Sequence, residues 1–161
     1  MIILAIDPGT TESGWIELYT NDLSIGHKGK DCNHKMLEII KQTPGDLIAI
    51  EMFASYGMPI GKSSIETIRW IGRFEQFIED NVGGHPMFYT RSQVKMHLCR
   101  RTAKINDAVI TQAIKDLFPL TGGGKDPSKG TKSQPGPLYG MAGDMWQALA
   151  LALTAANIRS V

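Results

Sequence analysis

The stretch IILAIDPGTTESGW, residues 2–15, decides the fold class of this chain. An apolar run leads to Asp7, and a Pro-Gly pair breaks the segment directly afterwards. This pattern predicts a buried strand with a carboxylate at its C-terminal edge. Residues 14–19 and 24–29 predict two further short strands, which turn residues connect into an antiparallel meander.

A second apolar run, residues 47–50, also ends in an acid, Glu51. Residues 86–89 predict a fifth short strand. Apolar residues at helical spacing, with Pro and Gly stops, predict helices that cover such a sheet. The chain is therefore predicted to be an α/β protein. The helices are expected over residues 33–42 (stopped by Pro44 and Gly45), 63–80, 92–98 (with Ser92 as a cap), 106–118 and 143–157.

The helix predicted over residues 63–80 has two signals of its own. Ser63 and Glu66 have the spacing of a capping box, which marks a helix start. Five apolar side chains fall along one stripe of the helix, and we expect this stripe to face the core. They are Ile65, Ile68, Ile71, Phe74 and Ile78.

The length of 161 residues corresponds to one domain. No apolar run reaches the roughly 20 residues that a membrane-spanning helix needs, and the N-terminus lacks the basic leader of a signal peptide. Two cysteines, Cys32 and Cys99, are too few for a disulfide scaffold and are typical of a reducing compartment. We therefore expect a single-domain cytoplasmic protein over residues 1–161 without a membrane partner.

The formal net charge of +1 hides an asymmetry along the chain. Residues 1–90 hold 7 Lys and Arg against 12 Asp and Glu, whereas residues 91–144 hold 9 against 4. The segment 91–104 contains only cations among its charged residues, which favours a polyanionic partner. A solvated basic face without a partner is the alternative. The cations are Arg91, Lys95, Arg100, Arg101 and Lys104.

Residues 119–143, which we call the basic loop, contain 11 of the chain's 25 Gly and Pro residues. An irregular segment of this length in a small domain is usually functional or disordered. We therefore expect a flexible loop that presents three lysines to a partner. These lysines are Lys125, Lys129 and Lys132.

Three acids occupy positions that favour a shared chemical role. Asp7 and Glu51 end buried strands, and Asp144 lies in the first turn of the last predicted helix. Carboxylates about 4 Å apart near a protein surface repel by roughly 4 kcal/mol, and a divalent cation removes that repulsion. Oxygen ligands without Cys or His favour Mg²⁺ or Mn²⁺, and two such ions can hydrolyse a phosphodiester. Taken singly, each acid also fits an ordinary turn, strand-edge or helix-terminus role.

Four segments, IDPGTTESGW, AIEMF, YTRSQVK and GDMWQALALALTAA, occur in the order found in the RuvC Holliday-junction resolvases. Over nearly its whole length the chain therefore resembles this family, which belongs to the ribonuclease H-like superfamily. The resemblance implies a mixed five-stranded sheet flanked by helices in a single domain. It also implies a homodimeric, metal-dependent endonuclease that resolves four-way and other branched DNA, with the apolar stripe of helix 63–80 as a possible symmetric interface.

The resemblance also assigns roles to residues of this sequence. Asp7, Glu51 and Asp144 would hold the catalytic Mg²⁺ or Mn²⁺, two ions per site. Lys95 would lie near the scissile phosphate, and Lys104 is the nearest match to a second basic residue of the family. The cations of segment 91–104 and of the basic loop would bind the DNA backbone.

The sequence departs from the family pattern at two points. The family's last helix carries D-x-x-D, whereas Gln147 stands three residues after Asp144. Gln147 shares the helix face, so it can offer a metal a carbonyl oxygen without charge, or it can remain solvated. The family's aromatic residue three positions after the glutamate is also absent. Phe53 and Tyr56 stand two and five positions after Glu51, and either could stack on an unpaired base or belong to the core.

Other functions remain open from the sequence. An RNA or RNA/DNA-hybrid nuclease of the same superfamily would use the same acids, and Gln147 also suits a non-catalytic branched-DNA-binding protein. The segment IDPGTT resembles the phosphate loop of sugar kinases and actin-like ATPases, but 161 residues are too few for their two domains, so no nucleotide cofactor is expected. The spacing of Cys and His residues around Cys32 and Cys99 does not fit a zinc site.

Overall fold

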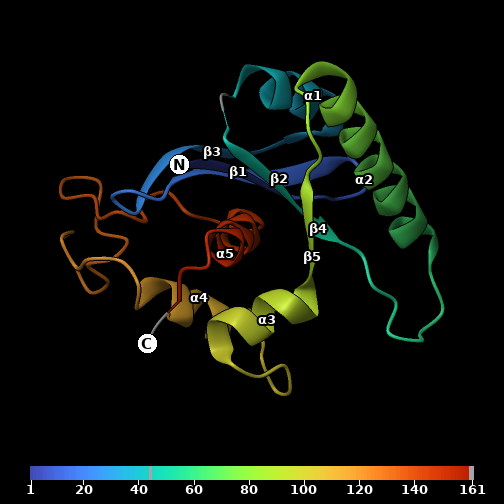
Figure 1. Ribbon diagram of the computed structural model, residues 1–161. Helices are drawn as coiled ribbons and strands as arrows, with labels where there is room; N and C mark the ends of the chain where they lie inside the picture. The colour runs from blue at the N-terminus through green and yellow to red at the C-terminus, as the bar shows by residue number, and fades with distance from the viewer. Residues whose placement is uncertain (44, 160–161) are drawn as a thin grey trace.

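The computed structural model describes residues 1–43 and 45–159. Pro44, expected to stop the first helix, lies outside the described residues, as do residues 160 and 161. A mixed sheet of five strands runs through the middle of the molecule in the order β3-β2-β1-β4-β5 (Figure 1). The strands are β1 (Ile2–Asp7), β2 (Glu12–Tyr19), β3 (Ser24–Cys32), β4 (Leu47–Met52) and β5 (Met87–Thr90).

The sheet combines two kinds of pairing. β1, β2 and β3 form the predicted antiparallel meander, whereas β4 runs parallel to β1 and β5 runs parallel to β4. The parallel strands β1 and β4 therefore end at the same edge of the sheet. This edge carries the two strand-terminal acids, so the predicted α/β class with a mixed five-stranded sheet is confirmed.

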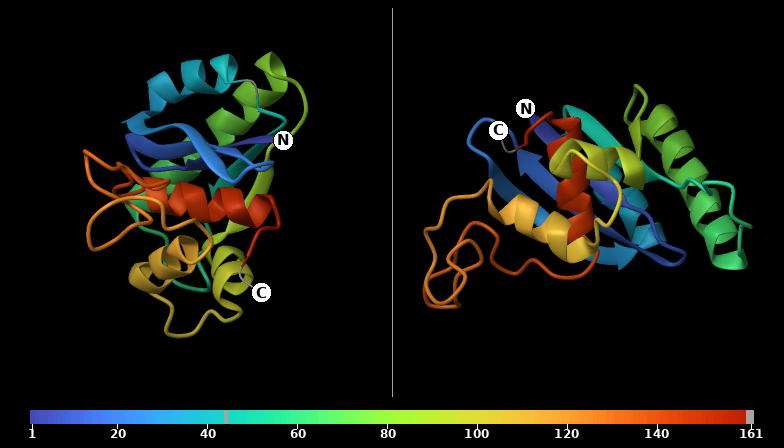
Figure 2. Two further views of the ribbon diagram at one scale, coloured as in Figure 1. Left: turned by 90° about the vertical axis from the view of Figure 1, so that its left-hand side faces the viewer. Right: turned by 90° about the horizontal axis from the view of Figure 1, so that it is seen from below.

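Helices cover both faces of the sheet (Figures 1 and 2). One face packs against α1 (Asn33–Gln42) and α2 (Lys62–Asn81), and the other against α3 (Arg91–Cys99), α4 (Asp107–Lys115) and α5 (Met145–Ala155). Side chains of β1 alternate between the two cores, because successive residues of a strand point to opposite faces. Leu4 and Ile6 face α1 and α2, while Ile3 and Ala5 face α5.

The start of α2 differs from the sequence prediction. The helix begins at Lys62 after Gly61, with no side-chain cap, so the predicted capping box does not form. Trp70 and the second half of the apolar stripe are buried, but Ile65 is 49% exposed and Ile68 is 37% exposed. The reason is geometric: the first turns of α2 extend past the sheet (Figure 1), and among the described residues the core beneath this helix begins at Trp70.

Helix α3 also begins earlier than predicted. Its cap is Thr90 rather than Ser92: the Thr90 hydroxyl accepts from the Gln93 amide, and the Gln93 side chain accepts from the Thr90 amide. This reciprocal capping box starts the helix at Arg91, directly after β5. Because α3 follows β5 without a loop, the backbone of Arg91 is held at the edge of the sheet where β4 and β5 end.

The basic loop extends from the end of α4 and returns to α5 (Figure 2). It has no helix or strand, but Gly130 and Pro135 form an isolated β-bridge and many backbone amides in the segment are hydrogen-bonded. At Gly130, which has a φ of +74°, a Cβ atom would lie 2.2 Å from the Gly136 nitrogen. The loop is therefore internally packed, and its flexibility stays a prediction. Of the helices described, none combines the length and apolar character that crossing a membrane requires.

Candidate active site

Two of the three acids lie side by side at the edge of the sheet. Ile6 of β1 is opposite Ile50 of β4 in a parallel register, so Asp7 and Glu51 follow on adjacent strands. Each side chain shares its sheet face with the residue two positions earlier, Ala5 or Ala49, and both of these alanines belong to the core beneath α5. Asp7 and Glu51 therefore point to the same face.

The third acid is brought in by the start of α5. Asp144 is the N-cap residue of this helix, and it lies directly over Gly14 of β2. Gly14 is in turn the cross-strand partner of Asp7. A Cβ atom on Gly14 would lie 2.6 Å from the Asp144 Cβ, so only glycine allows α5 to begin this close to the sheet.

The proximity of the acids affects the titration of Asp7. Burial, followed by the negative charges of Glu51 and Asp144, raises the pKa of Asp7 to about 8. Burial also raises the pKa of Glu51, against the opposing effect of Arg91. The Oε2 atom of Glu51 is buried and has no hydrogen-bond donor among the described residues. Such a group is costly unless a cation or proton joins it.

Lys30 is a site residue that the sequence analysis missed. Its ammonium lies 2.8 Å from Asp144 Oδ2 and 3.9 Å from Glu12 Oε2. The signal was in the register: Lys30 of β3 is the cross-strand partner of Gly14, and cross-strand partners share one face of a sheet. The carboxylate of Asp144 is thereby neutralised by a half-exposed lysine.

Arg91 occupies the centre of the site rather than the open surface. One guanidinium nitrogen donates to Gln147 Oε1 and lies 3.7 Å from Glu51 Oε2, and the other contacts Asp107 Oδ1. Gln147 does point into the site, as the helix spacing predicts, but its oxygen accepts from an arginine. Asp107, in the first turn of α4, is a second missed residue, and its charge contributes to the raised pKa of both Asp7 and Glu51.

The acids do not form a closed metal cage. Among residues 1–43 and 45–159, no group of three His, Cys, Asp or Glu side chains stands at metal-ligating separation. The pairing explains this spacing, because Asp144 is drawn to Lys30 and Glu51 to Arg91. The donor set nevertheless fits a hard divalent cation: all the atoms are carboxylate oxygens, and Glu51 Oε2 accepts no hydrogen bond from the described residues.

A small cavity of about 120 Å³ opens beside Asp7 and Glu51. Phe53 lines this cavity and also packs against the core beneath α2, so the structure gives it a packing contact. Tyr56 is 61% exposed, and its hydroxyl accepts a hydrogen bond from the Ser92 amide at the start of α3. Of the two aromatic residues, only Tyr56 presents a free ring.

The cations of segment 91–104 separate into two groups. Arg91 lies in the site, and Lys95, one helical turn later, is close enough for its charge to lower the pKa of Glu51. Arg100, Arg101 and Lys104 are exposed beyond the end of α3. No contact between these three and the acids is present among the described residues.

Buried polar side chains hold the turn that follows Asp7. The Ser13 hydroxyl donates to Asn33 Oδ1 at 2.6 Å, and Asn33 Nδ2 donates to the Gly9 carbonyl at 2.9 Å. Ser13 and Asn33 are both fully buried. This bridge connects the start of α1 to the turn, so it fixes the backbone around Asp7. The sequence pattern alone offered no signal for it, because the contact joins segments twenty residues apart.

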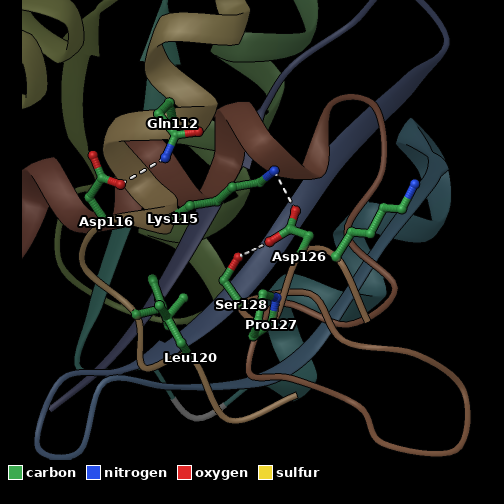
Figure 3. Close-up of a pocket in the computed structure, with 9 residues that line it drawn as sticks. Gln112, Lys115, Asp116, Leu120, Asp126, Pro127 and Ser128 are labelled. Atoms are coloured by element: carbon green, nitrogen blue, oxygen red, sulfur yellow. Dashed lines mark hydrogen bonds and ion pairs between the residues drawn. The ribbon is translucent and has the colours of Figure 1, made fainter. Parts of the chain in front are cut away.

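The basic loop is anchored to α4 beside a cavity of about 560 Å³. The Lys115 ammonium contacts Asp126 at 2.6 Å, and the Ser128 hydroxyl donates to the same carboxylate at 2.6 Å (Figure 3). The Lys129 ammonium lies 5.9 Å from the ring centre of Trp146, next to Gln147. Lys125 and Lys132 are exposed. Of the three predicted lysines, Lys129 thus contacts the first turn of α5.

The order of the strands in the sheet and the helices on its two faces can be compared with those of solved structures. The structure of T. thermophilus RuvC in complex with Holliday junction substrate matches with a TM-score of 0.66 and 18% identity, covering 97% of this chain and 93% of that one. A second Thermus thermophilus RuvC structure matches with a TM-score of 0.66 and 17% identity, covering 98% and 94%. No family model and no curated protein matches the sequence. The RuvC-like fold is therefore shown by structure.

Proposed function

We propose that this chain is a metal-dependent endonuclease that cuts branched DNA, above all four-way junctions. The observation that carries the proposal is the convergence of Asp7, Glu51 and Asp144 from three separate elements. Two neighbouring buried carboxylates, Asp7 and Glu51, cost stability without a compensating cation, and groups with such perturbed pKa values gather at functional sites. The solved RuvC with a Holliday junction substrate supports junction DNA as the substrate class.

The metal would be Mg²⁺ or Mn²⁺, held by Asp7, Glu51 and Asp144. When bound, it lowers the pKa of a coordinated water and neutralises charge on the phosphate. Asp7 is the acid with the strongest need for it, because its pKa is raised and no described residue forms an ion pair with it. The Ser13–Asn33 bridge holds the backbone next to Asp7, which keeps the carboxylate oriented.

Lys95 and the surface cations would bind the DNA. Lys95 lies near Glu51, so its ammonium can reach a phosphate placed at the acids. Lys129 of the basic loop lies beside the ring of Trp146 near the start of α5, and Lys30 lies beside Asp144, so both would be available to backbone phosphates near the site. Backbone contacts of this kind select DNA by shape rather than by base sequence. Tyr56 is the residue that would stack on an unpaired base.

Resolution of a four-way junction needs a cut in each of two strands, and a second copy of the chain would make the second cut. The first turns of α2 carry exposed Ile65 and Ile68, and at Gly72 on the same helix a side chain would meet open space. An exposed apolar face next to a small residue suits close helix–helix contact between two copies.

The exposed Cys32 and partly exposed Cys99 are free thiols, which fits a reducing compartment such as the cytoplasm.

The test is cleavage of matched synthetic substrates with Mg²⁺ or Mn²⁺. A four-way junction, a fork, a linear duplex and an RNA/DNA hybrid of shared sequence are compared on denaturing gels. We expect cleavage of the junction in preference to the others, and the Asp7→Asn variant should bind the junction without cutting it. Preferred cutting of the hybrid would move the substrate class to RNA-containing duplexes. Binding without cutting by the unaltered chain would make it a non-catalytic junction-binding protein.

A further inference from the structure

Arg91 is held inside the site by contacts that a surface phosphate-binding arginine would not have. Its guanidinium is bound on one side by Gln147 and on the other by Asp107, and Glu51 lies 3.7 Å away. The side chain is only 24% exposed. Its backbone is fixed by the Thr90–Gln93 capping box, which starts α3 at this residue. The position of the charge is thus set by the fold.

Gln147 is the natural partner for such an arginine. Its amide oxygen accepts a hydrogen bond but has no negative charge to balance a divalent ion. An arginine stays positively charged at every physiological pH, so it repels a cation placed beside it. On this side of the site, Asp107 is already paired with the guanidinium. The remaining ligands are therefore too few, and the local charge too positive, for a metal near Gln147.

The other side of the site has the opposite character. Asp7 has no ion pair with a described residue, and Glu51 Oε2 accepts no hydrogen bond from the described residues, although Arg91 lies 3.7 Å from it on the other side. The ammonium that pairs with Asp144 belongs to Lys30, a half-exposed and flexible side chain that can move to solvent. Once the Lys30 ammonium leaves Asp144, a cation on this side would compete with no other ion pair of Asp7 or Asp144 among the described residues.

We propose that Arg91 takes the place of a second metal ion in this site. One divalent cation binds at Asp7, Glu51 and Asp144, and the Arg91 guanidinium, anchored by Gln147 and Asp107, supplies the second positive charge. A guanidinium has five N–H donors in a planar fork, so donors remain to contact a non-bridging phosphate oxygen. There it stabilises negative charge that develops during phosphodiester cleavage. This inference rests on the proposed nuclease function, and it replaces the two ions expected from the sequence with one.

The test counts metal ions directly, without relying on activity. The chain of 161 residues is titrated with Mn²⁺, and free Mn²⁺ is measured by electron paramagnetic resonance. We expect one tightly bound ion per chain. The double variant Arg91→Met/Gln147→Asp restores a second acid and removes the blocking charge, so it should bind two. Arg69→Met, which removes an exposed arginine paired with Glu66 on α2, is the matched control and should bind one.

The outcomes separate this inference from the proposed function. Two tightly bound ions in the unaltered chain, each lost in Asp7→Asn, would overturn the role of Arg91 while leaving a metal nuclease intact. No tight ion in the unaltered chain would overturn both. A count of one in the double variant, with its fold verified by circular dichroism, would also contradict the inference, because Arg91 would then not be what excludes the second ion.

Discussion

Replacing Asp7 with asparagine should stabilise the metal-free protein while removing its activity. The pKa of Asp7 is raised from 3.8 to about 8 by burial and by its acidic neighbours. The folded state therefore binds the proton more tightly than the unfolded state does. The stability that this proton provides is fully present below about pH 4 and is lost as the pH rises to about 8. Asparagine keeps the shape of the side chain and carries no charge, so it avoids that loss.

The size of the effect follows from the shift. One pKa unit corresponds to about 1.4 kcal/mol, so a shift of about four units sets an upper limit of roughly 6 kcal/mol at pH 8. Relaxation of the neighbouring acids reduces this value, and we expect a gain of about 2–4 kcal/mol for Asp7→Asn at pH 8. At about pH 5 the gain should be much smaller, because Asp7 is then protonated in the folded protein.

Urea denaturation in EDTA at both pH values measures this gain. The control is Asp80→Asn, an exposed acid on α2, whose replacement should change little at either pH. Mg²⁺ at a hundredfold excess over its Kd should stabilise the unaltered chain by about 2.7 kcal/mol and should hardly affect Asp7→Asn. Equal stability of Asp7→Asn and the unaltered chain at pH 8 would refute the reasoning, because Asp7 would then not be held against repelling charges.

Three further predictions concern the start of α5, the lysines and the exposed face of α2. Gly14→Val would place side-chain atoms within the space of Asp144, so it should lower the free energy of unfolding by about 1–3 kcal/mol and reduce cleavage. Lys95→Ala should slow single-turnover cleavage about 100-fold with little change in affinity for the junction. Neutralising the basic-loop lysines should instead lower this affinity and flatten its dependence on salt. The reverse pattern would assign catalysis to the loop lysines and DNA binding to Lys95. Ile68→Asp should convert a dimer to a folded monomer in analytical ultracentrifugation, and an unchanged dimer would move the interface away from α2.

The sequence predicted the sheet and its acids because both depend on short-range patterns. An apolar run that ends in an acid identifies a buried strand and its edge wherever it occurs, and Asp7 and Glu51 both follow this rule. Gly14 and Asp144 lie at the starts of a strand and a helix that the sequence pattern also predicted, over residues 14–19 and 143–157. Helix ends were less accurate: Thr90 rather than Ser92 caps α3, because both residues can cap and only the end of β5 decides between them.

The missed features all depend on contacts between distant segments. Ile65 and Ile68 belong to a regular apolar stripe, but the stripe does not reveal where the sheet beneath it ends. Lys30 reaches Asp144 only through the pairing of β3 with β2. Asp107 reaches Arg91 only because α4 packs beside α3. Arg91 was expected on the DNA-binding surface with its neighbours, since a count of charges cannot separate a residue that points into a site from one that points to solvent.

Anomalous diffraction from crystals soaked in Mn²⁺ tests the central claim most directly. The account predicts a peak bound by carboxylate oxygens of Asp7, Glu51 and Asp144, at the roughly 2.0–2.2 Å typical of small hard cations, with the Lys30 ammonium displaced from Asp144. A crystal without such a peak, in which Asp144 keeps Lys30 and Glu51 keeps Arg91 at saturating Mn²⁺, would contradict the assignment of this edge of the sheet as a metal-dependent nuclease site.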